Sequence, residues 1–160
     1  MKPNEFQEWS EEITDRQFEQ AVGHIYDELG WDARVTQSKK DGGMDGRLYK
    51  NEELQVVSIK QQVEDKSGIA PIHLREIVGV AVRVNAAKAI LVTNGQGSNR
   101  TQEEEKIYRN RSDIDVELVE FMDLYKMVVQ NDLFEVTEKY DTGLRDKVNS
   151  LIDDQSQPES

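Results

Sequence analysis

The segment DGGMDGRLYKNEELQVVSIK, residues 41–60, decides how the chain folds. Its first six residues, 41–46, hold three glycines and two aspartates, which favour turns. The strand-like run RLYK (47–50) follows, then a polar turn, then the β-branched run LQVVSIK (54–60). The preceding segment WDARVTQ (31–37) is also strand-like. Turn residues between strand-like runs predict a three-stranded antiparallel meander.

Helical and strand-like patterns alternate along the rest of the chain. Residues 15–29 place apolar side chains at helical spacing, with Asp15 as the expected N-cap and Gly30 as the stop. After the meander we expect a helix at 68–84, a buried strand at 86–93, a helix at 98–110, a strand at 114–119 and a helix at 121–129. Alternating strands and helices predict parallel crossovers. The predicted fold is one α/β domain, with a mixed central sheet flanked by helices.

The two ends of the chain differ in character from its centre. Residues 1–14 are interpreted as a polar N-terminal arm or short helix, and residues 15–130 as the domain. Residues 131–152 are expected to form a helical extension, with a last helix at 141–151. The segment DDQSQPES (153–160) is polar, and we expect it to be disordered.

The composition narrows the class of protein. The chain has 160 residues, enough for one domain with a core. It has no cysteine, which excludes disulfides and thiolate metal sites, and it has no apolar run near the roughly 20 residues that cross a bilayer. Its N-terminus lacks the apolar core of a signal peptide. We therefore expect a soluble cytoplasmic protein without a membrane partner.

The net charge of −12 is unevenly distributed. Residues 33–100 carry eleven basic and seven acidic side chains, whereas residues 1–32 and 101–160 carry net charges of −7 and −9. The mildly basic centre is compatible with phosphate contacts, which require Lys and Arg. The acidic flanks fit two explanations: a solubilising surface, or adaptation to a salty cytoplasm in which repulsion is screened.

Three interpretations fit residues 41–60. The first is a calcium-binding EF-hand loop from Asp41 to Glu52, with Asp45 at its fifth position. Such a loop lies between two helices, whereas both flanks here are strand-like, so we disfavour it. The second is a polar hairpin without chemistry, which is the usual reason for Asp-Gly pairs.

The third interpretation is a metal-dependent phosphodiesterase site. Period-two alternation places Ser58 and Lys60 on one face of a strand expected at the centre of the sheet, where a lysine needs a partner. Asp45 begins the neighbouring strand and offers hard oxygen ligands for Mg²⁺, and the carbonyl of Ile59 would add another. Lys60 would orient the attacking water and offset charge on the phosphorane.

The order of these motifs resembles the Mrr-type restriction endonucleases of the PD-(D/E)xK nuclease superfamily. The resemblance covers about residues 16–129 and lies in Phe18-Glu19 of the first helix, DGGMDG (41–46), VVSIKQ (56–61), HLREIVGVAV (73–82) and KAILVTNG (88–95). It implies a restriction-endonuclease-like αβββαβ core and a DNA endonuclease that depends on Mg²⁺ or Mn²⁺. DNA would be the substrate, and a homodimer partner or a separate subunit would supply target recognition.

Carried over by position, the resemblance makes Asp45 the metal-binding aspartate, Lys60 the catalytic lysine and Glu19 a carboxylate linked to the metal. The family usually has Gln or Glu two residues before the lysine, where this chain has Ser58. A serine hydroxyl is a shorter and poorer ligand. Two alternatives to a restriction-type nuclease therefore stay open. One is a catalytically silent nuclease-fold protein that binds DNA or a partner, and the other is a structure-specific, junction-resolving nuclease.

Overall fold

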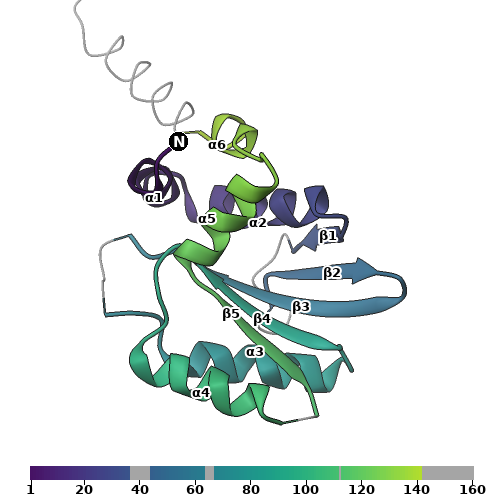
Figure 1. Ribbon diagram of the computed structural model, residues 1–160. Helices are drawn as coiled ribbons and strands as arrows, with labels where there is room; N and C mark the ends of the chain where they lie inside the picture. Colours follow the sequence, from purple (N-terminus) through teal and green to yellow (C-terminus); the bar gives the residue numbers. More distant parts are fainter. Residues whose placement is uncertain (37–43, 64–66, 112, 142–160) are drawn as a thin grey trace, which may run out of the picture.

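The computed structural model describes residues 1–36, 44–63, 67–111 and 113–141. A five-stranded sheet with helices on both faces forms its centre (Figure 1). The strands are β1 (Asp32–Val35), β2 (Gly46–Lys50), β3 (Glu53–Lys60), β4 (Lys88–Thr93) and β5 (Asp115–Val119), and they lie side by side in that order. The α/β fold with a mixed central sheet, predicted from the sequence, is confirmed.

The two halves of the sheet differ in strand direction. β1, β2 and β3 pair antiparallel, as the predicted meander requires. β3, β4 and β5 pair parallel, because each parallel connection needs a crossover, which here contains a helix. β3 is therefore the central strand, with an antiparallel neighbour on one side and a parallel neighbour on the other.

Each face of the sheet carries its own layer of helices. These are α1 (Pro3–Glu12), α2 (Asp15–Glu28), α3 (Pro71–Arg83), α4 (Asn99–Arg109), α5 (Phe121–Gln130) and α6 (Glu135–Lys139). Figure 1 shows α3 and α4 together on one face, and α1, α2, α5 and α6 on the other. Buried apolar side chains form one core per face, which includes Phe18 and Leu124 in the first and Leu74 and Ile77 in the second.

β3 contributes to both cores through alternate side chains. Val57 and Ile59 pack in the core under α2, whereas Val56 packs in the core under α3. The alternation of a strand puts Ser58 and Lys60 on the same side as Val56, toward α3. Ser58 is buried and Lys60, the last residue of the strand, is half-buried.

Local signals set the ends of α2. Its N-cap is Thr14, whereas the sequence had predicted Asp15. The Thr14 hydroxyl accepts from the N–H of Gln17, and the Gln17 side chain accepts from the N–H of Thr14. This capping box satisfies two backbone donors, and Asp15 is already the first helical residue. The chain leaves the helix at Gly30, as predicted, with a φ of 98° that favours glycine.

The N-terminal segment is a packed helix, so of the two forms expected for residues 1–14 the short helix is correct and the polar arm is wrong. Phe6 is fully buried, and its ring centroid lies 5.6 Å from that of Tyr125 on α5. The indole N–H of Trp9 donates to the carbonyl of Tyr140 at 2.7 Å. Phe6 and Trp9 are three residues apart, so they lie on the same side of α1, whereas Glu5, Glu8 and Glu12 are exposed.

The structure describes residues 131–141 of the predicted C-terminal extension, and these include α6. From residue 142 onward, the helix predicted at 141–151 and the tail predicted at 153–160 lie outside the described residues. Within the described part of the chain, no helix is both long enough and apolar enough to cross a membrane.

Candidate active site

Asp45 lies immediately before β2, where its main chain joins three strands. Its N–H donates to the carbonyl of Val57 on β3 at 2.8 Å. Its carbonyl accepts from the N–H of Thr36 at 2.8 Å and from the Thr36 hydroxyl at 3.0 Å. Because Thr36 directly follows β1, Asp45 fastens the adjoining ends of β1, β2 and β3 together. The sheet therefore fixes the position of this aspartate.

One oxygen of the Asp45 carboxylate takes part in the same network. Oδ2 accepts from the N–H of Ile59 at 2.6 Å and lies 3.4 Å from the hydroxyl of Ser58. The other oxygen, Oδ1, has no hydrogen bond to any residue in the described part of the chain. A carboxylate with one oxygen fixed and the other available is already oriented for a hard cation.

α2 brings a second carboxylate to this region. The Glu19 side chain is 12% exposed, and Arg16, one turn earlier, lies 3.2 Å from its Oε2. Arg16 also donates to the carbonyl of Thr36 at 2.6 Å, which ties α2 to the end of β1. Burial raises the pKa of Glu19, the negative charges of Asp45 and Asp15 raise it further, and Arg16 lowers it. Carboxylates that repel one another in a cleft are a feature of functional sites.

A cavity of about 410 Å³ opens between these groups and the end of β3. Its wall consists of Asp15, Glu19, Met44, Asp45, Ile59, Lys60, Gln61 and Glu76. The structure thus brings together four of the predicted site residues, namely Glu19, Asp45, Ile59 and Lys60. The wall contains four carboxylates and one ammonium, so a cation is favoured in it.

Lys60 reaches this cavity from the last position of β3. Within the described residues, its ammonium has no hydrogen bond and no ion pair. The partner expected for a lysine in a central strand is not required, because the strand ends here and the side chain enters an open cavity and not a dry core. The ammonium is therefore available to a water molecule or a phosphate.

Ser58 is placed differently from the other candidates. It is 3% exposed and does not belong to the cavity wall. Its hydroxyl faces Asp45 Oδ2 across neighbouring strands. The position where the family pattern has a long acceptor therefore contributes a short hydroxyl, which supports the Asp45 carboxylate from behind the cavity.

The two glutamines after Lys60 do not replace that acceptor. Gln61 Nε2 donates to the carbonyls of Ser10 and Ile13, both at 2.8 Å. Gln62 Oε1 accepts from the N–H of Gln96 at 3.1 Å, in the loop after β4. Gln61 thus joins the end of β3 to the end of α1, and Gln62 joins it to the loop after β4.

The EF-hand interpretation is wrong. β2 occupies residues Gly46–Lys50, in the middle of the segment that would form the calcium loop. Strands and not helices flank the segment, and helices are what an EF-hand requires. Asp41, the proposed first ligand of that loop, lies outside the described residues.

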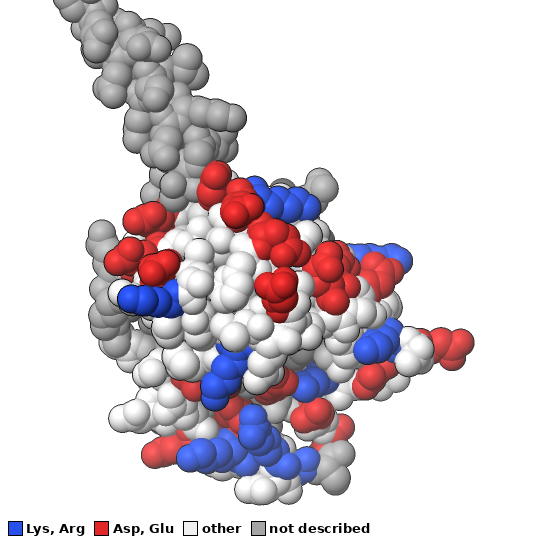
Figure 2. Space-filling model, turned by 45° about the horizontal axis from the view of Figure 1, so that its top comes forward, with Lys and Arg blue, Asp and Glu red and all other residues white. Residues whose placement is uncertain are grey.

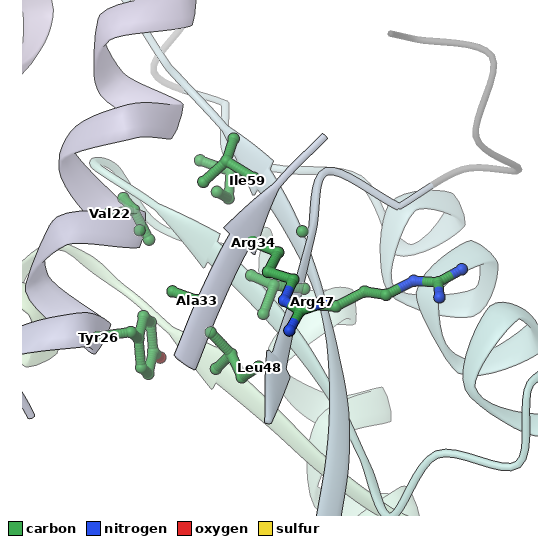
Figure 3. Close-up of a pocket in the computed structure, with 11 residues that line it drawn as sticks. Val22, Tyr26, Ala33, Arg34, Arg47, Leu48 and Ile59 are labelled. Carbon is green, nitrogen blue, oxygen red and sulfur yellow. The ribbon is translucent and has the colours of Figure 1, made fainter. Parts of the chain in front are cut away.

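Figure 3 shows a second hollow, between α2 and the meander, where Val22 and Tyr26 lie near Ala33 and Leu48. Its volume of about 10 Å³ leaves room for about one water molecule at most. This hollow is a packing gap in the core and not a ligand site.

A group of possible metal ligands also lies between α2 and α6. Ligand atoms of His24, Glu28 and Glu135 lie within 4.8 Å of one another. The ammonium of Lys139 lies 3.5 Å from Nδ1 of His24, so a positive charge already occupies this neighbourhood. None of these residues belongs to the wall of the 410 Å³ cavity.

Two charged residues of the cavity wall, Asp15 and Glu76, are not among the site residues predicted from the sequence. Glu76 lies on α3, and only the packing of this helix against the sheet brings it near Lys60. One signal was available: Glu76 precedes Ile77, a residue of the buried stripe of α3, and lies in the half of the helix that follows the end of β3.

Comparisons with known proteins give a family and a fold. A family model for Mrr catalytic domains, described as a restriction endonuclease, matches residues 10–128. No curated protein matches the chain significantly. The crystal structure of a protein of unknown function, AF1548, has a TM-score of 0.57 at 9% sequence identity, and the match covers 72% of this chain and 67% of that one. At this identity the structural similarity supports the fold alone.

Proposed function

The chain belongs to the Mrr-type restriction endonuclease family, and from that premise we propose that it is a divalent-metal-dependent DNA endonuclease of the restriction and defence type. The family makes a nuclease-type function the expectation. The observation that carries the finer proposal is the meeting of Glu19, Asp45 and Lys60 at one cavity, from α2, the start of β2 and the end of β3.

The donor atoms at the cavity fit Mg²⁺ or Mn²⁺. Asp45 Oδ1, the Glu19 carboxylate and the carbonyl of Ile59 are hard oxygen ligands, and one or two carboxylates with retained waters suffice for Mg²⁺. The volume of about 410 Å³ leaves room for those waters and for a phosphate. A bound ion would polarise the scissile phosphate. It would also relieve the charge repulsion that, together with burial, raises the pKa of Glu19.

Lys60 has the role of the catalytic lysine in this proposal. Its ammonium donates a hydrogen bond to the attacking water and offsets the negative charge of the phosphorane. The attacking water gives up one proton to solvent as its oxygen forms the new bond to phosphorus, the bond from phosphorus to the leaving sugar oxygen breaks, and that oxygen takes a proton from solvent. The products are a phosphomonoester end and a hydroxyl end.

The distribution of acidic and basic side chains on the surface affects how strongly the protein would bind DNA. Figure 2 shows acidic side chains over the upper part of one face and basic side chains gathered at its lower end. On α4, Arg100 and Lys106 are exposed. With a net charge of −12, non-specific attraction to DNA is weak. We therefore propose that a homodimer partner or a separate subunit provides target recognition, and that the enzyme meets DNA in the cytoplasm.

A second candidate function follows from Ser58. Because this residue supplies only a buried hydroxyl, the chain would serve as a silent nuclease-fold protein that binds DNA or a partner without cutting. This alternative predicts binding without metal-dependent strand breaks.

A plasmid-cleavage assay tests the proposal. Supercoiled DNA, methylated and unmethylated, is incubated with wild-type protein, Asp45→Asn, Lys60→Ala and the control Lys126→Ala, in Mg²⁺, Mn²⁺ or EDTA. Asparagine keeps an acceptor for the Ile59 N–H and removes the charge, and Lys126 is an exposed lysine on α5. We expect metal-dependent cutting by wild type and the control, and a loss of at least about a hundredfold in the two site variants. Equal cutting by all four proteins would show that the site is misassigned.

A further inference from the structure

The wall of the cavity toward α3 lacks the acceptor that the family pattern places two residues before the lysine. Ser58 and Lys60 point to the α3 side of the sheet, together with Val56. Lys60 reaches the cavity, but Ser58 stays behind the wall at 3% exposure. Asp45 Oδ1 and Glu19 alone would leave a cation with few charged partners on this side.

Glu76 is the carboxylate on that side. α3 follows β3 and leads into β4, which is parallel to β3, so α3 runs back along the sheet and its first half lies near the carboxyl end of β3. Leu74 and Ile77, both fully buried, anchor this half of the helix against the sheet. Glu76 lies between them and lines the same cavity as Lys60.

The Glu76 side chain makes few interactions with the rest of the described chain. Its only ion-pair neighbour within the described residues is His73, whose Nδ1 lies 4.0 Å from Glu76 Oε2, and 55% of the glutamate side chain is exposed. A pair at that distance and exposure is weak. The carboxylate is therefore free to change rotamer and turn into the cavity at little cost.

We propose that Glu76 takes over the function of the missing acceptor at position 58 and helps to bind the divalent cation held at Asp45 and Glu19. This inference rests on the proposed function. The ligand atoms of Asp45, Glu19 and Glu76 do not all lie within 4.8 Å of one another. Glu76 therefore acts through water: it accepts hydrogen bonds from the hydration shell that Mg²⁺ and Mn²⁺ largely retain in proteins.

Metal affinity tests the inference independently of cleavage. The Mn²⁺ dissociation constant is measured by the electron paramagnetic resonance of free Mn²⁺ for wild type, Glu76→Gln, Asp45→Asn and the control Glu103→Gln. Glu103 is an exposed glutamate on α4, so its variant removes the same charge far from the proposed ligands in sequence. We expect Glu76→Gln to weaken Mn²⁺ binding about tenfold, Asp45→Asn to weaken it more, and Glu103→Gln to leave it within about twofold of wild type.

A restoring variant sharpens the test. In Ser58→Glu the family's acceptor returns, so adding Glu76→Gln to that background should change the Mn²⁺ dissociation constant by less than about threefold. A further tenfold loss in the double variant would overturn the inference, as would an unchanged constant in Glu76→Gln alone. If Ser58→Glu does not fold, by circular dichroism, Glu76→Gln alone decides, since its side chain is exposed and nearly isosteric.

The inference and the proposed function fail in different ways. Cleavage that needs Lys60 but is accompanied by unchanged Mn²⁺ affinity in Glu76→Gln overturns the role of Glu76 and leaves the nuclease. Mn²⁺ binding that needs both Asp45 and Glu76, without any cleavage, supports the role of Glu76 and points to the silent alternative. A wild-type protein that binds no Mn²⁺ overturns both.

Discussion

Replacing Gln61 with leucine should loosen the connection between α1 and the end of β3. Gln61 directly follows Lys60, and its amide donates to the carbonyls of Ser10, in the last turn of α1, and Ile13, just beyond it, both at 2.8 Å. Such carbonyls have no partner within their own helix. Leucine has a similar volume but no donor, so the variant removes two hydrogen bonds and leaves two acceptors without their partner.

The expected loss follows from those two bonds. Each contributes about 0.5–1.5 kcal/mol, so Gln61→Leu should lower the free energy of unfolding by about 1–3 kcal/mol. For a protein of 160 residues, that corresponds to a fall in Tm of about 2–12 °C. The Lys60 ammonium should also be less precisely positioned, so kcat should fall, whereas the Mn²⁺ affinity that we propose for Asp45 and Glu19 should change little.

Urea and thermal unfolding followed by circular dichroism measure the stability change, with Gln20→Leu as the control. Gln20 is an exposed glutamine on α2, and its replacement should stay within about 0.5 kcal/mol of wild type. If Gln61→Leu also stays within that range, the two hydrogen bonds do not hold α1 to the strand, and the reasoning is refuted.

Three further predictions follow from the fold and the site. Phe6→Ala should destabilise the protein by about 3–5 kcal/mol in urea unfolding, because a fully buried aromatic side chain is lost. The control is Glu8→Ala, at an exposed position. A change in Phe6→Ala as small as that of the control would show that α1 is not packed against the domain. In the folded state the pKa of Glu19 is raised above 4.5, by burial first and by neighbouring carboxylates second. Its contribution to stability therefore falls as the pH rises from 4.5 through the raised pKa. Glu19→Gln should therefore be more stable than wild type at pH 7 without metal, and the difference should shrink at pH 4; an unchanged difference would count against the assignment. Finally, if the acidic flanks are an adaptation to salt, the unfolding midpoint should rise steeply in molar KCl, whereas indifference to KCl would leave a solubilising surface.

The strands could be predicted because their signals are local. Gly and Asp clusters separate the strand-like runs of the meander, and the alternation from Val56 to Lys60 gives the face of each side chain before any packing is known. The same alternation, together with the place of Asp45 at the start of the neighbouring strand, predicted site residues that the structure brings to one cavity. Ser58 was also selected, but its depth behind the wall depends on how β2 lies across it.

The remaining features depended on tertiary packing or on a weak signal. Residues 1–14 were interpreted as a polar arm or a short helix, and the packing of α1 was not predicted because acidic residues outnumber its few apolar ones, although Phe6 and Trp9 already lie at helical spacing. Glu76 was not selected, because its place next to the buried stripe of α3 is a weak signal and its place at the cavity depends on the direction of α3 after the crossover. The N-cap of α2 differed by one residue, since Thr14 and Asp15 are both good caps and only the reciprocal bonds with Gln17 decide between them.

The double use of Asp45 affects how relatives of this chain should be sorted into cutting and non-cutting proteins. The main chain and one carboxylate oxygen of Asp45 hold β1, β2 and β3 together, so a descendant that abandoned cleavage would still be selected to keep an acceptor there. The Lys60 ammonium has no hydrogen bond or ion pair within the described residues, so no side-chain contact in that part of the fold would resist its loss once cleavage ceased. In a relative of this chain, a lysine kept at this position is therefore stronger evidence for cleavage activity than a kept aspartate. The aspartate alone indicates only common descent.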